Sequence, residues 1–292
     1  MIVNDGFKIA INRIAKTTPD YLEVSKMAFG SDQISIVSTD TDLTKKIPYH
    51  KYAVVSACDA ITDWNGIDIR SLISLNTTSF KEGTGSLNIY KTSTTSSAIL
   101  GLSNGSLTTR NFTDKYISFW IYFKTAAILS KFNLLTVKYG TDSSNYYYNT
   151  FTAVAGWNNI IMNQVDFIVD IGSPDVTDCQ YFGIDLTFVT GTDTIAEADV
   201  MIDDVFLFET ADYYKDFEAS YPTIDETNFE ITYKGYLDLT MCNGFLINSI
   251  AIFNEDTSPL MQDIFMFPGI SKSSTDELSF IAKNRLVRRW IL

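Results

Sequence analysis

The sequence is poor in the residues that most catalytic and metal sites need. It has one histidine, His50, and three widely separated cysteines, Cys58, Cys179 and Cys242. Zinc sites with two histidine ligands are therefore excluded, and a histidine-dependent triad would have to use His50, which has no nucleophile motif near it. An odd number of cysteines without a CxxC pair predicts buried thiols and no disulfide framework. The GxSxG, Walker A and GxGxxG motifs are also absent, so we expect no enzyme.

Basic residues and long apolar runs are scarce as well. The 22 Lys and Arg stand against 35 Asp and Glu, which gives a formal net charge of −13. Phosphates repel such a chain, and its only basic run is residues 283–289, so we expect no nucleic-acid partner. No run of about 18 apolar residues occurs, so we expect no membrane insertion. The first residues lack the pattern of a secretory signal, which predicts synthesis without Sec export.

Aromatic residues, in contrast, are abundant: the chain has 20 Phe, 16 Tyr and 4 Trp. They favour pleated surfaces, and 46% hydrophobic residues are typical of a globular chain, so the composition predicts a mainly β protein. Eight strands are expected in the middle of the chain, separated by Gly, Asn, Asp, Ser and Thr clusters: Ser86–Tyr90, Ala98–Leu102, Tyr116–Phe123, Asn133–Tyr139, Tyr146–Phe151, Asn158–Asn163, Tyr181–Phe188 and Asp199–Glu209. Their spacing predicts a β-sandwich or jelly roll.

The two ends of the chain predict a second, smaller domain. Residues 6–16 have apolar side chains at helical spacing, and residues 22–30 have the pattern of a strand. These elements are too few to form a core alone. Further strands are expected near the C-terminus: Phe229–Leu239, Phe245–Phe253, Ile264–Phe267 and Glu277–Ala282. We therefore expect a discontinuous α+β or β domain, residues 1–53 with 213–292, into which residues 54–212 are inserted.

Motifs in both terminal segments resemble bacteriophage tail-fibre and baseplate-associated proteins. The matching segments are Gly6–Arg13, Met27–Gly30, Asp40–Leu43, Gly244–Asn254 and Phe265–Ser273. Lys272, Ser273, Glu277 and Leu278 keep the family's pattern, whereas Ser249 replaces its usual acid and Ala251 its usual glycine. The resemblance implies a virion structural protein that assembles in the host cytoplasm. Its terminal domain would attach to other virion proteins, and copies of the chain would associate, with a trimer favoured.

The middle of the chain resembles jelly-roll carbohydrate-binding modules. Four segments carry this resemblance in the order that those modules have: Phe80–Ile89, Tyr116–Phe123, Gly156–Ile160 and Val200–Glu209. Together the two resemblances imply a tail-fibre adhesin that binds host surface glycan. Two alternatives stay open: a head-decoration or head-fibre protein that caps or stabilises the capsid, and a polysaccharide depolymerase with two carboxyl groups about 5–9 Å apart.

The resemblance to carbohydrate-binding modules also implies a structural calcium ion. The matching positions are Asp59 or Asp63, Glu82 with the carbonyl groups of the Gly83–Gly85 loop, and Asp203 or Asp204. Calcium takes six to eight oxygen ligands, and glycine allows backbone carbonyls to turn towards an ion. The alternative is that these acids are solvated turn residues.

Glycan binding needs flat aromatic faces and groups that bind hydroxyls. Tyr146 and Tyr148 lie on one face of a predicted strand, and Trp64 beside Asn65 is a second candidate. The alternative for the tyrosines is packing on a sheet. Trp120 and Trp157 are expected in the core.

Overall fold

The chain divides into two compact units. The computed structural model describes residues 24–31, 35–36, 40–225, 230–254 and 261–285, so the helix predicted over residues 6–16 lies outside the described residues. Met1–His50 with Ala211–Leu292 form unit 1, and Lys51–Thr210 form unit 2. The insertion thus begins at residue 51 and ends at residue 210, where the sequence placed it at 54 and 212.

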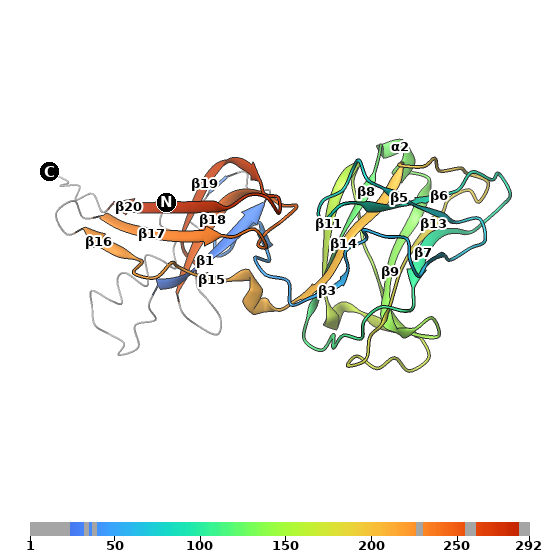
Figure 1. Ribbon diagram of the computed structural model, residues 1–292, viewed down its shortest axis with the longest axis horizontal. Coiled ribbons are helices and arrows are strands. Elements are labelled where there is room, and N and C mark those ends of the chain that lie inside the picture. Colours follow the sequence, from blue (N-terminus) through green and yellow to red (C-terminus); the bar gives the residue numbers. More distant parts are fainter. Residues whose placement is uncertain (1–23, 32–34, 37–39, 226–229, 255–260, 286–292) are drawn as a thin grey trace. The chain divides into compact units, whose positions relative to one another are not determined.

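Unit 2 is a sandwich of two antiparallel sheets (Figure 1). The first, named the β8 sheet, has six strands. In spatial order they are β11 (Gly156–Asn163), β8 (Tyr116–Phe123), β14 (Val200–Phe208), β6 (Ser86–Tyr90) and β5 (Leu72–Asn76), with β3 (Ala53–Ser56) also paired to β14. The loop between β5 and β6, residues 77–85, is important for the site described below.

The second sheet, named the β9 sheet, also has six strands. Their order is β12 (Ile168–Ile171), β10 (Asn145–Thr150), β9 (Phe132–Asp142), β13 (Tyr181–Phe188), β7 (Ile99–Asn104) and β4 (Trp64–Gly66). Helical structure in unit 2 is limited to short turns such as α2 (Ala126–Leu129) and a 3-10 turn at Gln164–Asp166. The prediction of a mainly β jelly-roll sandwich is confirmed.

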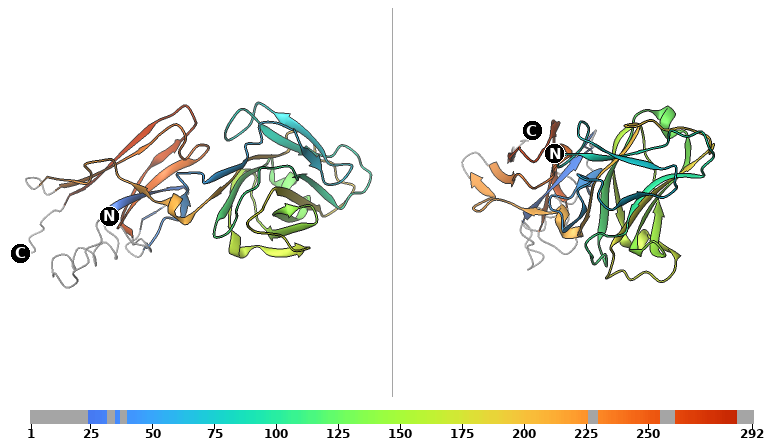
Figure 2. Two further views of the ribbon diagram at one scale, coloured as in Figure 1. Left: turned by 60° about the horizontal axis from the view of Figure 1, so that its bottom comes forward. Right: turned by 45° about the vertical axis from the view of Figure 1, so that its right-hand side comes forward.

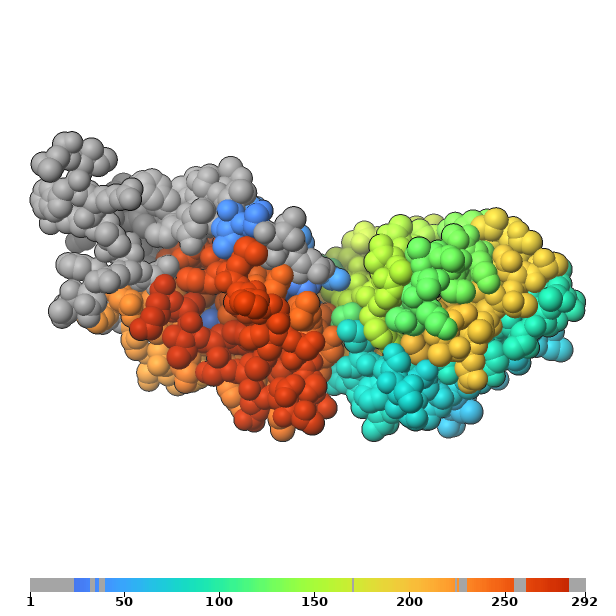
Figure 3. Space-filling model, turned by 90° about the horizontal axis from the view of Figure 1, so that it is seen from above, coloured from blue at the N-terminus to red at the C-terminus, as the bar shows by residue number. Residues whose placement is uncertain are grey.

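Alternation along the strands builds the core between these sheets, which face each other in Figure 2. In β8, Phe119 and its alternate neighbours are fully buried in the sandwich core. The Phe119 ring lies 5.8 Å from that of Phe182 in β13, in an edge-on arrangement. Burying each such ring contributes about 1.5–3 kcal/mol. The space-filling view shows α2 (green) beside residues 190–199 (yellow) (Figure 3). Just after α2, Lys131 Nζ donates to the Thr194 carbonyl at 2.7 Å.

Unit 1 brings the two ends of the chain into one sheet. Its strand order is β15 (Lys215–Asp216), β1 (Val24–Ser31), β18 (Leu246–Asn254) and β19 (Met261–Ser271), and β2 (Lys45–Ile47) also pairs with β1. In the β1–β18 ladder, Ala28 lies opposite Ala251 and Gly30 opposite Ser249. The two positions that depart from the phage pattern therefore face the N-terminal strand.

A second sheet of unit 1 packs on the first. It consists of β16 (Thr223–Asp225), β17 (Glu230–Leu237) and β20 (Leu278–Arg285). The Phe280 ring of β20 lies 5.4 Å from that of Phe29 in β1. A side chain at Gly235 would come within 2.5 Å of the Met27 sulfur, so these two strands approach as closely as glycine allows.

Two further features agree with the composition. Cys58, Cys179 and Cys242 are buried free thiols, as predicted. Among the residues that the structure describes, no helix is long and apolar enough to cross a membrane.

The close approach of β1 to β18 gives a first prediction. Replacing Gly30 by Ala places a methyl group 2.5 Å from Ser249 Oγ, so we expect the variant to lose about 1–3 kcal/mol of unfolding free energy through overpacking. Ser249 Oγ is buried and has no hydrogen-bond partner among the residues that the structure describes, so Ser249→Ala removes the clash without breaking any bond described there. Thermal unfolding should show that the double variant is more stable than Gly30→Ala alone. If the double variant instead loses the sum of the unfolding free energies lost by Gly30→Ala and Ser249→Ala, this description of the packing would be contradicted.

Candidate functional site

One row of side chains crosses the outer face of the β8 sheet from one edge strand to the other. Residues paired directly across antiparallel strands point to the same side of a sheet. The row is Trp157 (β11), Tyr122 (β8), Met201 (β14), Asn88 (β6) and Ser74 (β5). With neighbouring strands about 4.8 Å apart, the row is roughly 19 Å long.

The β11 and β8 end of this row is aromatic. The rings of Tyr122 and Trp157 lie 5.3 Å apart at 48°, and both side chains are half-buried, so part of each ring remains accessible. Tyr90 of β6 is half-buried and points to the same side, because it lies two residues after Asn88. It lies across β14 from Tyr122, two strand spacings (about 10 Å) across the sheet and two residues further along it. The outer face therefore carries aromatic groups on both sides of β14.

The β6 and β5 end of the row is polar. Asn88 Nδ2 donates to Ser74 Oγ at 2.9 Å, and Asn76 Nδ2 donates to Asn88 Oδ1 at 3.2 Å. The Ser74 hydroxyl in turn donates to the exposed carboxylate of Glu197. Both asparagines are buried, so the accessible polar groups at this end are the Ser74 hydroxyl and the Glu197 carboxylate, and both types bind hydroxyl groups.

A second row on the same face is covered by the 77–85 loop. Trp120 of β8 lies opposite Asn159 of β11 and Asp203 of β14. Its ring is only 6% exposed, and Lys81 Nζ lies 4.5 Å above its centre. Trp120 is buried, as predicted, but it lies under the loop on the outer face, because Phe119 and its alternate neighbours occupy the inner face of β8. The prediction that Trp157 belongs to the core is wrong, since it is half-buried on the same outer face.

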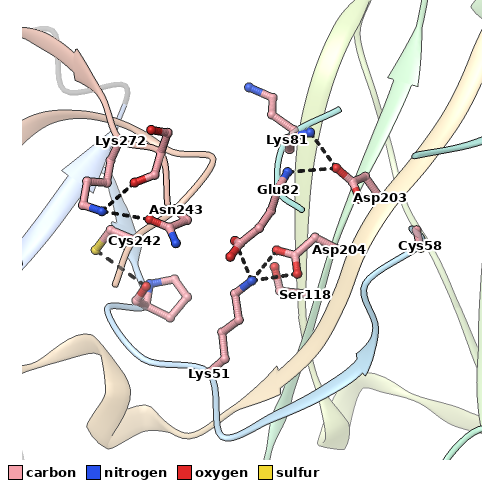
Figure 4. A network of polar contacts seen from close by, with 12 residues as sticks. Lys51, Cys58, Lys81, Glu82, Ser118, Asp203, Asp204, Cys242, Asn243 and Lys272 are labelled. Atoms are coloured by element: carbon pink, nitrogen blue, oxygen red, sulfur yellow. Dashed lines mark hydrogen bonds and ion pairs between the residues drawn. The ribbon is translucent and has the colours of Figure 1, made fainter. Parts of the chain in front are cut away.

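Four of the five acids proposed as calcium ligands meet beside this loop. Lys51 Nζ lies between two of them and donates to Glu82 Oε2 at 2.7 Å and to the Asp204 oxygens at 2.7 and 2.8 Å (Figure 4). Asp203 Oδ2 accepts from the backbone N–H groups of Lys81, at 2.6 Å, and Glu82, at 3.1 Å.

The remaining two acids differ from each other. Asp59 Oδ1 accepts from the backbone N–H groups of Thr84, at 2.6 Å, and Gly85, at 2.7 Å. Asp63 is exposed in the turn before β4, and its side chain takes no part in these contacts. Within the described residues, no group of three or more His, Cys, Asp and Glu side chains is arranged to hold a metal ion. As arranged, nitrogen donors bind these carboxylates, which does not fit the oxygen shell of calcium.

Burial dominates the electrostatics of this cluster. It raises the pKa of Asp203 to about 7, although the N–H groups of Lys81 and Glu82 oppose the shift. It also raises the pKa of Asp204 to about 6, against the attraction of Lys51. Burial lowers the pKa of Lys51, but Asp204 and Glu82 outweigh it, and the net shift is upward. The attraction between Lys51 and Asp204 thus opposes the effect of burial on both groups.

The tyrosines predicted to bind glycan lie on the opposite side of the sandwich. Tyr146 and Tyr148 point outwards from the β9 sheet, since Tyr148 pairs with Lys138. Tyr146 is only 5% exposed, because Tyr181 packs 5.7 Å from its ring and Lys138 Nζ lies 4.8 Å from its centre. Tyr148 is half-buried and accessible. The β9 face thus offers one accessible ring of this pair.

The second predicted pair is split between the two sides of β4. Trp64 lies in the sandwich core, with its ring 6.2 Å from that of Phe182. Asn65 points the other way, is exposed, and donates to the Asp63 carbonyl at 3.2 Å. The sequence analysis did not predict a site on the outer face of the β8 sheet. The alternation within Tyr116–Phe123, which places Trp120 and Tyr122 on one side of the strand, could have indicated it.

The raised pKa of Asp203 predicts a dependence of stability on pH. Between about pH 4 and pH 7 the folded chain keeps a proton on Asp203 that the unfolded chain has lost. This group should therefore make the unfolding free energy fall as pH rises through the window, by at most about 1.4 kcal/mol per pH unit. Asp204, whose pKa is also raised, adds to the fall below about pH 6. Asp203→Asn retains an oxygen for the two N–H groups and should flatten this slope.

Thermal unfolding of both proteins from pH 4 to pH 8 checks this expectation. Asp63→Asn is the matched control, because Asp63 is exposed, and asparagine tolerates the left-handed backbone at its φ of 63°. An Asp203→Asn profile as steep as that of the wild type would show that another group carries the dependence.

Comparison with known proteins finds similar folds only among solved structures. No family model and no curated protein sequence matches the chain. The family 11 carbohydrate-binding module of Clostridium thermocellum, solved with a β-1,3-1,4-mixed-linked tetrasaccharide, is 12% identical, with a TM-score of 0.40 over 54% of this chain and 95% of that one.

Two further structures are similar at the same level. A xylan-binding module from Paenibacillus barcinonensis is 15% identical, with a TM-score of 0.34 over 55% of this chain and 99% of that one. The family 30 module of a cellulosomal cellulase from Clostridium thermocellum is 12% identical, with a TM-score of 0.36 over 56% and 96%.

Proposed function

We propose that unit 2 is a non-catalytic module that binds a carbohydrate chain across the outer face of the β8 sheet. The observation that carries this proposal is the row from Trp157 to Ser74, which is aromatic at one end and polar at the other. The ligand lies along the row, with its sugar rings on Trp157 and Tyr122 and its hydroxyl groups towards Ser74 and Glu197.

The chemistry of the row suits a sugar better than other ligands. A sugar ring has an apolar C–H face that packs on an aromatic ring, and its edge carries hydroxyl groups that need hydrogen-bond partners. The half-buried rings of Tyr122 and Trp157 supply the first contact, and Ser74 and the exposed Glu197 supply the second. Asn88 is buried and holds the Ser74 hydroxyl from below. Met201 and Asn88 in the middle of the row are buried, so its accessible groups lie at the two ends. A ligand that reaches both ends must be several sugar units long, which favours a polymer over a single monosaccharide.

The same face argues against glycoside hydrolysis. That reaction uses two carboxyl groups on opposite sides of the scissile bond. Asp203 lies on this face, but it is fully buried and holds the 77–85 loop through two backbone N–H groups. Glu197 is exposed at the polar end of the row. A depolymerase would need a second accessible carboxyl group opposite Glu197, so we favour binding without cleavage.

The terminal segments extend this proposal to a phage virion. Their resemblance to tail-fibre and baseplate-associated proteins supports an adhesin in which unit 1 attaches to the particle and unit 2 binds host surface glycan. Association as a trimer would raise a weak sugar affinity by effective concentration. Antibody labelling of particles separates this adhesin from the capsid-decoration alternative: label at the tail tip favours adhesion, and label on the head favours decoration.

Substitutions on the two outer faces test where the carbohydrate binds. A glycan array identifies a ligand of the full chain, and titration calorimetry measures its affinity for each variant. Trp157→Ala and Tyr122→Ala each remove a stacking ring and should weaken binding about tenfold, which corresponds to 1.4 kcal/mol. Tyr148→Ala removes the accessible ring of the β9 face and should leave the affinity unchanged.

Circular dichroism and thermal unfolding establish that each variant is folded. Loss of binding in Tyr148→Ala with full binding in Trp157→Ala would move the site to the β9 face. If the wild-type chain binds no glycan on the array or on host cells, the proposed function is wrong.

A further inference from the structure

We propose that the ammonium group of Lys51 takes the place of the calcium ion predicted for this acidic cluster, so that unit 2 secures its 77–85 loop with a lysine instead of a metal. This inference concerns the architecture of the module and does not depend on which ligand the outer face binds.

The position and bonding of Lys51 Nζ support this assignment. Three carboxylate oxygens, one from Glu82 and two from Asp204, lie 2.7–2.8 Å from the nitrogen. These are the lengths of charge-assisted hydrogen bonds, and an ammonium group has three N–H donors to make them. Calcium would need six to eight oxygens at 2.3–2.6 Å. The site is therefore matched to an ammonium group in both number and distance.

Burial makes this ion pair difficult for solvent to break. The side chains of Asp204 and Lys51 are 3% and 17% exposed, respectively. On its other side, Lys51 Nζ lies 4.8 Å from the centre of the Phe206 ring, a second favourable contact for a cation. Two ionised carboxylates without a positive charge would be costly beside each other at this depth, so a cation between them stabilises their ionised forms.

The backbone of β14 explains why Asp204 is available. The ladder between β14 and β8 is irregular between Asp203 and Phe206, and Asp204 has a positive φ of 47°. Such a bulge re-aims side chains, and aspartate tolerates this conformation better than most residues. Asp203 bonds the loop backbone, while Asp204 meets Lys51. The bulge therefore allows Asp203 to bind the loop backbone while its neighbour Asp204 binds Lys51.

The lysine also joins parts of unit 2 that are distant in sequence. Lys51 stands at the start of the unit, 31 residues before Glu82 and 153 before Asp204. Asp59 and Asp203 bind N–H groups of the same loop, so all four acids act on residues 81–85 or on Lys51. Because the ammonium group is tethered to the chain, it competes with free cations at a high effective concentration.

Thermal unfolding of the full chain, with excess EDTA or excess calcium chloride, tests this inference. The wild-type Tm should be the same in both solutions. Lys51→Ala removes the ammonium group and leaves space between Glu82 and Asp204, so its Tm in EDTA should be well below that of the wild type. Calcium should then raise the Tm of Lys51→Ala, because the exposed carboxylates now need a cation.

Lys124→Ala is the matched control. Lys124 also pairs with an acid of unit 2, Asp199, at 3.0 Å, but its side chain is 56% exposed. Its loss should change the Tm little, and calcium should have no effect. A wild-type Tm that rises with calcium or falls with EDTA would overturn the inference, and so would a folded Lys51→Ala variant that does not respond to calcium. If Lys51→Ala does not fold, the comparison of the wild-type Tm in EDTA and in calcium still tests whether the site binds calcium.

Discussion

The alternation of side chains along β8 determines both faces of the β8 sheet at once. Because successive residues of a strand point to opposite sides, placing Phe119 and Phe123 in the core forces Trp120 and Tyr122 outwards. A shift of one residue would bury the second pair and expose the first. The hydrophobic core therefore positions the aromatic face, and the face needs no separate scaffold.

The 77–85 loop divides that face into a covered part and an accessible part. Over the covered part, Lys81 lies above Trp120, and the buried acids of β14 hold the loop backbone. In the accessible part, Tyr122 and Trp157 remain half-buried, and β14 separates them from the polar groups of β6 and β5. Four of the five acids that were predicted as metal ligands, all except Asp63, thus hold the 77–85 loop over this face. In a chain of net charge −13, the half-buried Lys51 places one positive charge between Glu82 and Asp204.

Unit 1 also depends on strand pairing between residues far apart in the chain. Its N-terminal strand β1 is completed by β18, more than 200 residues later, and Gly30 is tolerated there because Ser249 occupies the space of its missing side chain. Ala28 and Ala251 are paired small residues in the same ladder. The insertion of unit 2 between these strands leaves the pairing intact, as expected when an insertion enters a surface connection.

What the sequence determined by itself was local. Period-two hydrophobicity and turn residues predicted β6, β8 and β13 with their observed ends, because these signals act between near neighbours. The short edge strands β4, β5 and β12 were missed, since they have few residues and weak alternation. Only the tertiary structure decided which side of each strand faces the core, which acids Lys51 joins, and that Trp64 is buried while Trp157 is accessible. These outcomes depend on strand register and on a bulge, which result from contacts between residues far apart in the chain.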